Sequence, residues 1–162
     1  MTDVFLGLGS NVDAHKNMRS CMDHLETKFG QLEYSPVYQS PAVGFEGNVF
    51  LNMVVKIKTN LQARDLRDWL RLLEDKHGRD RTTPRFSDRH LDVDILLFGN
   101  RIQDKDGIKL PRGEILEQAY VLKPLSDIAP KMRHPIAKKS YRRLWSEFAN
   151  ENDVACLKLT TL

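Results

Sequence analysis

The stretch Leu91-Asp92-Val93-Asp94-Ile95-Leu96-Leu97-Phe98 is an apolar run interrupted only by two aspartates. A run of this length and composition predicts a buried β-strand, and the Gly99-Asn100 that follows predicts a turn. Because side chains alternate along a strand, Asp92 and Asp94 are expected on one face, about 7 Å apart along the chain. Val93 and Ile95 are expected on the opposite face, toward the core.

The segments before this strand predict the order of the fold. Strands are predicted over residues 4–8, 31–39 and 49–57, and helices over residues 14–29 and from Asn60 to Gly78. Pro36 makes the second strand irregular or an edge strand, and Asn60 is the expected N-cap of the second helix. The resulting order, β-α-β-β-α-β, predicts an α+β fold of the ferredoxin-like type, in which helices pack on an antiparallel sheet.

The part of the chain after residue 98 is predicted to extend the same domain. A small hairpin is expected around Asp106-Gly107, and helices over residues 114–128 and 140–148. We therefore expect a single domain over residues 1–162, with a core at 3–98 and an extension at 99–162. No role is predicted for residues 136–162.

The formal net charge of +3 is concentrated in two basic segments. Residues 76–90 carry five Lys or Arg against two acids, and residues 131–143 carry six against none. Such segments indicate a polyanionic partner (small-molecule phosphates, nucleic acid or a membrane surface) or simply solvated faces. No apolar run approaches the ~20 residues that cross a bilayer. The two cysteines are typical of reduced thiols, so we expect a cytoplasmic protein.

The paired carboxylates directly follow an arginine-rich loop, and this combination suggests chemistry on phosphates. Asp92 and Asp94 repel each other unless a cation compensates, and Mg²⁺ commonly binds one or two carboxylates plus substrate phosphates. Arginines of residues 79–90 suit polyphosphate oxygens. Together they predict phosphoryl or pyrophosphoryl transfer, while a solvated Asp-x-Asp face beside a plain surface loop explains the same residues equally well. The sequence has no P-loop, dinucleotide fingerprint or zinc-type spacing.

Five motifs, in their order along the chain, carry a family resemblance. They are Leu8-Gly9-Ser10-Asn11, Phe50-Leu51-Asn52, Arg89-His90-Leu91-Asp92-Val93-Asp94-Ile95-Leu96, Phe98-Gly99-Asn100 and Tyr120-Val121-Leu122-Lys123-Pro124-Leu125-Ser126-Asp127-Ile128-Ala129-Pro130. Through them, roughly residues 3–135 resemble 6-hydroxymethyl-7,8-dihydropterin pyrophosphokinase, a family of folate biosynthesis. The resemblance implies transfer of the β,γ-pyrophosphate of ATP to the hydroxymethyl group of the pterin, giving AMP. It implies ATP as a substrate, two Mg²⁺ ions and small-molecule partners, and we expect a monomer that binds neither nucleic acid nor a membrane.

The resemblance assigns the phosphate side of the site residue by residue. It implies that Asp92 and Asp94 hold the Mg²⁺ ions, in agreement with the chemistry of the pair. The triphosphate-binding arginines of the family correspond to Arg79, Arg81, Arg85 and Arg89, of which Arg79 and Arg89 act in the transfer. Their loop is expected to close over the substrates. Further nucleotide contacts correspond to Glu74, Ile95 and Ile108, and Arg112 offers a phosphate contact where the family usually has histidine.

The resemblance also implies where the pterin binds. Phe50 and Tyr120 correspond to two aromatic side chains that enclose the flat ring, and Asn52 to an asparagine that contacts its edge. Ser40 and Val43 correspond to positions whose backbone groups contact the ring. Taken without the resemblance, Phe50 and Tyr120 are ordinary core residues and Asn52 is a turn residue.

Two stretches depart from the family pattern. Arg85-Phe86-Ser87-Asp88-Arg89 stands where the family usually has Arg-Trp-Gly-Pro-Arg, and Gln118 stands where it has a second arginine. These changes touch the nucleotide contacts. They leave open a divergent paralogue that binds a pterin or nucleotide with weak or no transfer. A third hypothesis is an RNA-binding module of the same fold, although the aromatic run of an RNA-recognition motif is missing.

Overall fold

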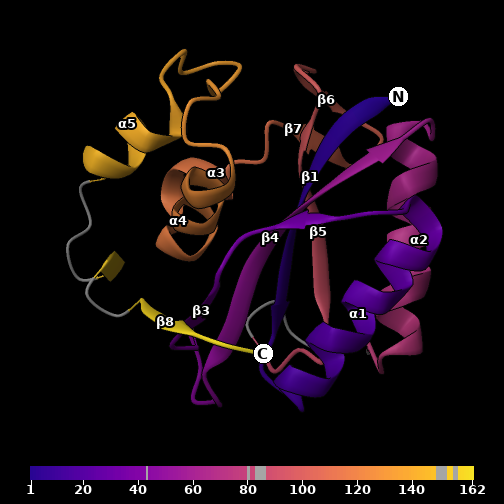
Figure 1. Cartoon of the computed structure of the whole chain (residues 1–162). Helices are drawn as coiled ribbons and strands as arrows, with labels where there is room; N and C mark the ends of the chain where they lie inside the picture. The colour runs from indigo at the N-terminus through magenta and orange to yellow at the C-terminus, as the bar shows by residue number, and fades with distance from the viewer. Residues whose placement is uncertain (43, 80, 83–86, 149–152, 155–156) are drawn as a thin grey trace.

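The structure is a computed structural model, which describes residues 1–42, 44–79, 81–82, 87–148, 153–154 and 157–162 (Figure 1). Its main sheet has the strand order β5-β1-β4-β3-β8, with β2 also paired to β4. The bounds are β1 Thr2–Ser10, β2 Glu33–Tyr34, β3 Val37–Ser40, β4 Phe50–Thr59, β5 Asp92–Phe98 and β8 Lys158–Thr160. The pairs of β1 with β4 and β5, and of β4 with β3, are antiparallel, so the predicted α+β, ferredoxin-like fold is confirmed.

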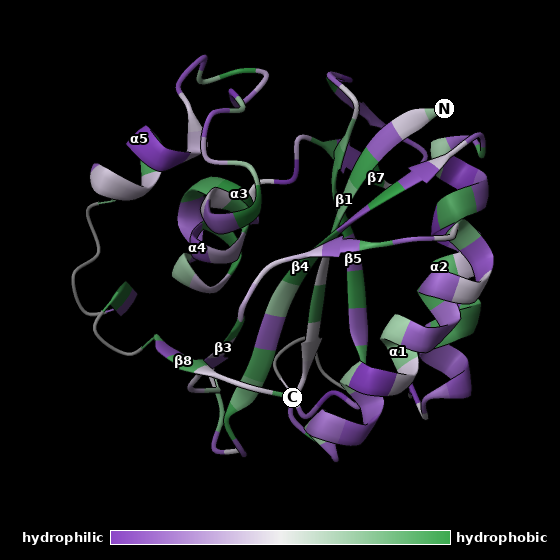
Figure 2. Ribbon diagram, in the orientation of Figure 1, coloured by the Kyte–Doolittle hydropathy of each residue, from purple (hydrophilic) through white to green (hydrophobic). Residues whose placement is uncertain are grey.

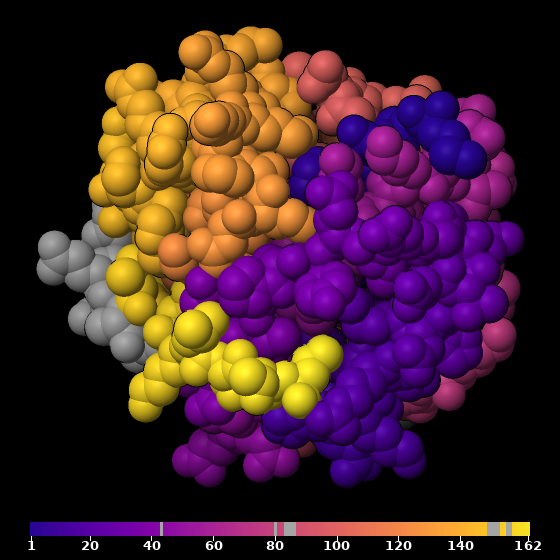
Figure 3. Space-filling view, viewed as in Figure 1, coloured from indigo at the N-terminus to yellow at the C-terminus, as the bar shows by residue number. Residues whose placement is uncertain are grey.

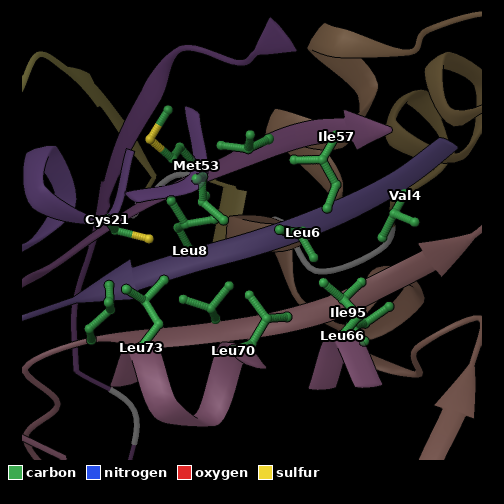
Figure 4. Packing of buried hydrophobic residues seen from close by; sticks show 14 of the residues in the cluster. Val4, Leu6, Leu8, Cys21, Met53, Ile57, Leu66, Leu70, Leu73 and Ile95 are labelled. Carbon is green, nitrogen blue, oxygen red and sulfur yellow. The ribbon is translucent and has the colours of Figure 1, made fainter. Parts of the chain in front are cut away.

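Helices α1 (Ala14–Phe29) and α2 (Ala63–Lys76) cover one face of this sheet. Both carry apolar and polar residues, as helices with one buried side do (Figure 2). Figure 4 shows the core between α2 and the sheet, where Leu66, Leu70 and Leu73 of the helix face inward-pointing strand residues. Cys21 of α1 is buried in the same core as a free thiol.

The prediction that Asn60 caps α2 is wrong. Strand β4 continues to Thr59, and Gln62 is the residue that precedes the helix. The hydroxyl of Thr59 accepts a hydrogen bond from the backbone N–H of Leu61 (3.0 Å). The turn is therefore closed by the last strand residue, and no side chain at Asn60 is required for it.

The other face of the sheet is covered by helices of the chain after residue 113. Helices α3 (Glu114–Glu117), α4 (Ala119–Ile128) and α5 (Tyr141–Ser146) follow the small hairpin of β6 (Gln103–Lys105) and β7 (Ile108–Leu110). The single helix expected over 114–128 is divided at Gln118, whose backbone is extended. Green apolar residues on α4 are visible in Figure 2, and a second apolar cluster joins this helix to the sheet. None of the helices in the described part of the chain is long and apolar enough to cross a membrane.

A β-bulge at Leu96 divides strand β5 into two halves. Leu6 pairs with Ile95 but Phe5 pairs with Leu97, so Leu96 is an extra residue on β5. Before the bulge, Val93 and Ile95 lie in the core beside α2, while Asp92 and Asp94 lie on the opposite face as predicted. Leu96 and Leu97 both join the cluster under α4. The four apolar residues 95–98 thus pack on both faces of the sheet.

The C-terminal segment forms an edge strand that the sequence analysis did not predict. β8 pairs antiparallel with β3, with Leu159 opposite Tyr38. Figure 3 shows this yellow segment lying across the purple surface of the molecule, and Leu162 packs against the main core. Residues 158–160 therefore complete the sheet beside β3, the strand that leads into the loop before β4.

Candidate active site

The candidate site lies on the face of the sheet that α3 and α4 cover, and it extends past strand β5 to α2. The strand register places Asp92 opposite Gly9 and Asp94 opposite Gly7, and it places Asn52 on the other side of Gly9. Because the two glycines of β1 have no side chains, a space remains between the aspartates of β5 and the asparagine of β4. The pairing of β4, β1 and β5 thus brings Asn52 to the same part of the sheet as Asp92 and Asp94, which lie far from it in the sequence.

Two adjoining cavities open at this place. The larger, of about 660 Å³, lies over the glycines of β1 and is closed by α3 and α4. The smaller, of about 240 Å³, lies beside β5 between α2 and the β6–β7 hairpin. Four of the predicted site residues line both cavities: Arg79, Asp92, Asp94 and Arg112. The two aspartates therefore form a wall between a roomy compartment and a narrow, mostly polar one.

Arg79 and Arg89 converge on Asp92. The guanidinium of Arg79 donates to the Asp92 carboxylate, and Nε of Arg89 lies 3.8 Å from the same oxygen. Nε of Arg79 is buried and has no hydrogen-bond partner among the described residues. A buried donor without a partner is costly unless a ligand supplies an acceptor. The Arg79 side chain thus has one buried donor whose hydrogen bond is not made within the described part of the chain.

Asp94 is held by an arginine from another part of the chain. Nη2 of Arg112 lies 3.6 Å from its carboxylate, and Arg112 also pairs with Glu114. Burial by the surrounding protein raises the pKa of Asp94 to about 6. The positive charge of Arg112 lowers this pKa, and the negative charge of Asp92 adds to the rise. The 44% of its side-chain surface that remains exposed faces the cavities, so a cation can reach this oxygen.

Glu74 forms the inner end of the smaller cavity. Its side chain is only 8% exposed and accepts a hydrogen bond from the backbone N–H of Val93 (2.9 Å). Nη2 of Arg81 lies 3.4 Å from its other oxygen. Burial raises the pKa of Glu74 to about 7, with a further rise caused by Asp92 and Asp94. The carboxylate thus fixes the strand that carries the aspartates and helps to place Arg81.

The two aspartates fit Mg²⁺ that is bound together with a phosphate-bearing substrate. Among the described residues, no group of three or more His, Cys, Asp or Glu side chains is placed to hold a metal ion. A pair of carboxylates alone matches Mg²⁺, which keeps several waters and takes its other ligands from substrate phosphates. The arginines that now neutralise the pair also match phosphate oxygens.

On the opposite side of the larger cavity, Asn52 has a fixed orientation. Its Nδ2 donates to the carbonyl of Tyr38 (3.2 Å) and to the hydroxyl of Ser40 (2.8 Å), and Asn52 is only 5% exposed. Its two donors are therefore used within the protein. Oδ1 remains on the side of Gly9, so Asn52 offers an acceptor to whatever enters this cavity.

Aromatic side chains form the remaining walls of the larger cavity. Phe50 of β4 and Tyr120 of α4, the two aromatic residues that the resemblance assigns to the ring, both line this cavity. Phe45 also lines it and meets the ring of Phe50 edge to face, with centroids 6.4 Å apart. Its floor contains Gly7 and Gly9 of β1, with the side chain of Leu96 over Gly7. A compartment with aromatic walls and one polar edge suits a flat heterocyclic ring.

Apart from the four residues that line both cavities, each described site residue lines one of them, and Arg89, which the resemblance assigns to the triphosphate, lines the larger. Ser40, Phe50, Asn52, Arg89 and Tyr120 line only the larger cavity, and Glu74, Arg81, Ile95 and Ile108 line only the smaller. Val43 and Arg85 lie outside the described residues. The sequence analysis missed Phe45, Arg67, Lys109 and Glu114, which also line the cavities. Phe45 was the one with a signal, as an aromatic residue in the loop just before Phe50.

A carboxylate pair among arginines, beside a pocket for a flat ring, defines a transferase of phosphate-containing groups. Comparison with known proteins agrees with this class. Residues 5–130 match the family model described as 7,8-dihydro-6-hydroxymethylpterin-pyrophosphokinase (HPPK). The chain belongs to this family, and the resemblance inferred from its motifs is confirmed.

Individual relatives are similar over most of the chain. A 2-amino-4-hydroxy-6-hydroxymethyldihydropteridine pyrophosphokinase of Aquifex aeolicus is 36% identical over 155 residues, covering 94% of this chain and 93% of the relative. The protein of the same name from Pseudomonas aeruginosa is 36% identical and covers 82% and 83%. The fold is shared with Plasmodium falciparum HPPK-DHPS, with a TM-score of 0.76 at 12% identity. That match covers 98% of this chain and 45% of the solved one, so the chain spans less than half of the two-part protein.

Proposed function

We propose that the two cavities hold the two substrates of the reaction of this family. The reaction transfers pyrophosphate from ATP to the hydroxymethyl group of 6-hydroxymethyl-7,8-dihydropterin, in folate biosynthesis. The pterin occupies the larger cavity and the nucleotide the smaller. The observation that carries this assignment is the wall they share, because Asp92 and Asp94 border both compartments and transfer has to occur where the compartments meet.

The residues around the wall act mainly by positioning and charge. The oxygen of the hydroxymethyl group forms a bond to the β-phosphorus, the bond from that phosphorus to the oxygen of AMP breaks, and the hydroxyl proton is released. Arg79 and Arg89 leave Asp92 for phosphate oxygens, and Arg112 does the same from Asp94. Guanidinium groups already aimed at this point stabilise negative charge as it develops in the transition state. Arg81 and Arg85 add contacts to the triphosphate.

Asp92 and Asp94 would hold the two Mg²⁺ ions, which would supply positive charge against the phosphates of the substrate. This part of the proposal is supported by the donor set, since two hard oxygen ligands without a third protein ligand among the described residues suit a metal that arrives with its substrate. Glu74, Ile95 and Ile108 line the nucleotide compartment around them.

In the larger cavity, Phe50 and Tyr120 enclose the pterin ring and Asn52 accepts a hydrogen bond from an N–H on its edge. Ser40 keeps Asn52 in this orientation, and Val43 contacts the ring from the preceding loop. As further parts of this proposal, residues 1–162 form one domain, and the protein works as a cytoplasmic monomer on small molecules, without nucleic acid or membrane.

Formation of AMP from ATP, in the presence of Mg²⁺ and hydroxymethyldihydropterin, tests the reaction directly. We expect AMP only when the pterin is present. Asp94→Asn removes one metal ligand with little change in shape, and it should lower the rate by at least about 100-fold. Asp23→Asn, on the exposed side of α1, is the matched control.

Binding measurements separate the enzyme from a binding protein. Titration with Mn²⁺ in the presence of ATP should show weaker metal binding for Asp94→Asn than for the control variant. Pterin binding by calorimetry without any AMP formation would favour the non-transferring paralogue instead.

A further inference from the structure

Tyr38 of β3 joins the edge of the main sheet to helix α4. Its side chain is only 8% exposed, and its hydroxyl donates a hydrogen bond to the carboxylate of Asp127, near the end of α4. Strand β3 and helix α4 lie against each other on the face of the sheet that carries the candidate site (Figure 1). One hydrogen bond therefore connects two elements whose bonded residues are 89 positions apart in the sequence.

The carboxylate of Asp127 has a fixed orientation of its own. Its other oxygen accepts a hydrogen bond from Nζ of Lys123, one turn earlier in α4 (2.9 Å). The same ammonium group lies 5.6 Å from the ring centroid of Trp145 in α5, as in a cation–π contact. Burial and the bond to Asp127 raise the pKa of Tyr38 far above its ordinary value, so the phenol stays protonated and remains a donor.

The backbone of Tyr38 holds the side chain of Asn52. The two residues are opposite each other in the pairing of β3 with β4, and the carbonyl of Tyr38 accepts from Nδ2 of Asn52 (3.2 Å). The second acceptor for Nδ2 is the hydroxyl of Ser40, which lies on the same strand (2.8 Å). Both groups that fix the amide of Asn52 thus belong to β3, so a displacement of this strand would displace both.

Strand β3 is short, and its outer edge is paired with the three-residue strand β8. An edge strand with little backbone pairing opens more readily than a central strand. Helix α4, to which Tyr38 is bonded, also carries Tyr120, one of the aromatic walls of the larger cavity. The bond between Tyr38 and Asp127 therefore fixes the strand that holds Asn52 relative to the helix that carries Tyr120.

We propose that Tyr38 and Asp127 are positioning residues for the larger cavity, and that their hydrogen bond keeps Asn52 aligned with the edge of a flat ring. In the described part of the chain, both lie outside the residues that line the two cavities, so they act through β3 without touching the ligand. This inference rests on the proposed function, which identifies the ligand of this cavity as the pterin. Oδ1 of Asn52 meets the edge of the ring only while Nδ2 is held by β3.

Proton exchange of the Asn52 side-chain amide tests this role without any ligand. Both N–H groups of this amide are bonded in the wild type, so NMR should show slow exchange with water. Tyr38→Phe removes only the hydroxyl, and Asp127→Ala removes its acceptor. We expect the Asn52 amide protons to exchange at least about fivefold faster in both variants. Asp127→Asn keeps an acceptor for the hydroxyl and should stay within about twofold of the wild type.

Two controls separate this effect from a general loosening of the fold. Tyr34→Phe removes a hydroxyl from the exposed tyrosine of β2 and should leave the exchange of the Asn52 amide within about twofold of the wild type. The melting temperature of Tyr38→Phe should fall by less than about 4 °C, because the ring stays packed and Asp127 keeps its bond to Lys123. A larger fall, with faster exchange of backbone amides throughout the sheet, would overturn the positioning role.

Binding of hydroxymethyldihydropterin measures the consequence for the cavity. Its Kd, titrated by fluorescence, should rise about fivefold in Tyr38→Phe and in Asp127→Ala, while the Kd for ATP with Mg²⁺ stays within about twofold. In the background of Asn52→Ala, the change Tyr38→Phe should raise the Kd for the pterin by less than about twofold, because its effect passes through Asn52. An equal rise in both backgrounds would show that Tyr38 does not act through Asn52.

The two proposals fail in different ways. Unchanged exchange of the Asn52 amide in both Tyr38→Phe and Asp127→Ala overturns the positioning role, whatever the wild type does with ATP. Absence of AMP formation by the wild type overturns the proposed function and leaves the exchange result standing.

Discussion

Nη2 of Arg112, in the connection between β7 and α3, lies 3.6 Å from the carboxylate of Asp94 on strand β5. Arg112 also pairs with Glu114, so the guanidinium is shared between two carboxylates. The family usually has a histidine at this position. A permanently charged group therefore faces Asp94 in this chain, and it lines both compartments of the site.

Replacement of Arg112 tests whether this guanidinium serves the nucleotide. Arg112→Ala should lower kcat by about 10- to 100-fold and raise the KM for ATP, because one fixed positive charge at the phosphates is lost. Stability should change by less than about 1 kcal/mol, since the pair is partly exposed. Arg112→His should recover part of the rate. Steady-state kinetics with Arg19→Ala as the control decides the point, and a kcat within twofold of the wild type would place Arg112 outside the machinery.

Asn52 and Ser40 make a prediction about the ring side. Ser40→Ala removes one of the two acceptors that hold Nδ2 of Asn52, so the KM for the pterin should rise about three- to tenfold while the KM for ATP stays constant. Asn52→Ala should raise the KM for the pterin more strongly, by about 100-fold. A common rise of both KM values in Ser40→Ala would argue that the bond supports the whole fold.

Gly9 tests the floor of the larger cavity. A Cβ at this position would lie 3.6 Å from Oδ1 of Asn52 and 4.0 Å from the ring of Phe50, which are ordinary contact distances. Gly9→Ala should therefore fold normally and yet weaken pterin binding by about tenfold, because the methyl group takes space from the ring. Gly113→Ala, where nothing lies within 4 Å of the added Cβ, is the matched control. Calorimetric titration with the pterin and thermal melting measure the two effects separately.

Glu74 predicts a dependence of stability on pH. Its pKa is raised from 4.5 to about 7 in the folded state, so the folded protein binds this proton more tightly than the unfolded chain. Stability from this group is full below pH 4.5 and is lost as the pH rises through 7. Glu74→Gln keeps an acceptor for Val93 but cannot ionise. In EDTA, it should be more stable than the wild type by about 1 to 3 kcal/mol at pH 8, and nearly equal at pH 5.

Thermal melting of both proteins at pH 5 and pH 8 checks this prediction. Asp75→Gln, with an exposed carboxylate on the same helix, serves as the control. An equal difference in stability between Glu74→Gln and the wild type at both pH values would show that burial does not raise the pKa of Glu74.

The parts of the site that were predictable depend on local pattern. Alternation along residues 92–95 is enough to put two carboxylates on one face, and the helical spacing of apolar residues gives α1 and α2. Pairings between segments far apart in the sequence produce no local sequence pattern from which they could be predicted. Three residues at 158–160 carry no strand signal of their own, and only β3 gives them a partner. In the same way, Tyr38 is recognisable as a strand residue, but its bond to Asp127 depends on where residue 127 returns in space.

The bulge at Leu96 has a consequence for how the pocket can change. Removal of this one residue would leave Asp92 and Asp94 opposite the same glycines, and Phe98 on the same side of the sheet, because the extra residue lies between two halves of regular pairing. Its side chain lies over Gly7 on the cavity floor. A change of chain length at this point would thus alter the floor of the larger cavity, while Asp92 and Asp94 keep their places opposite Gly9 and Gly7.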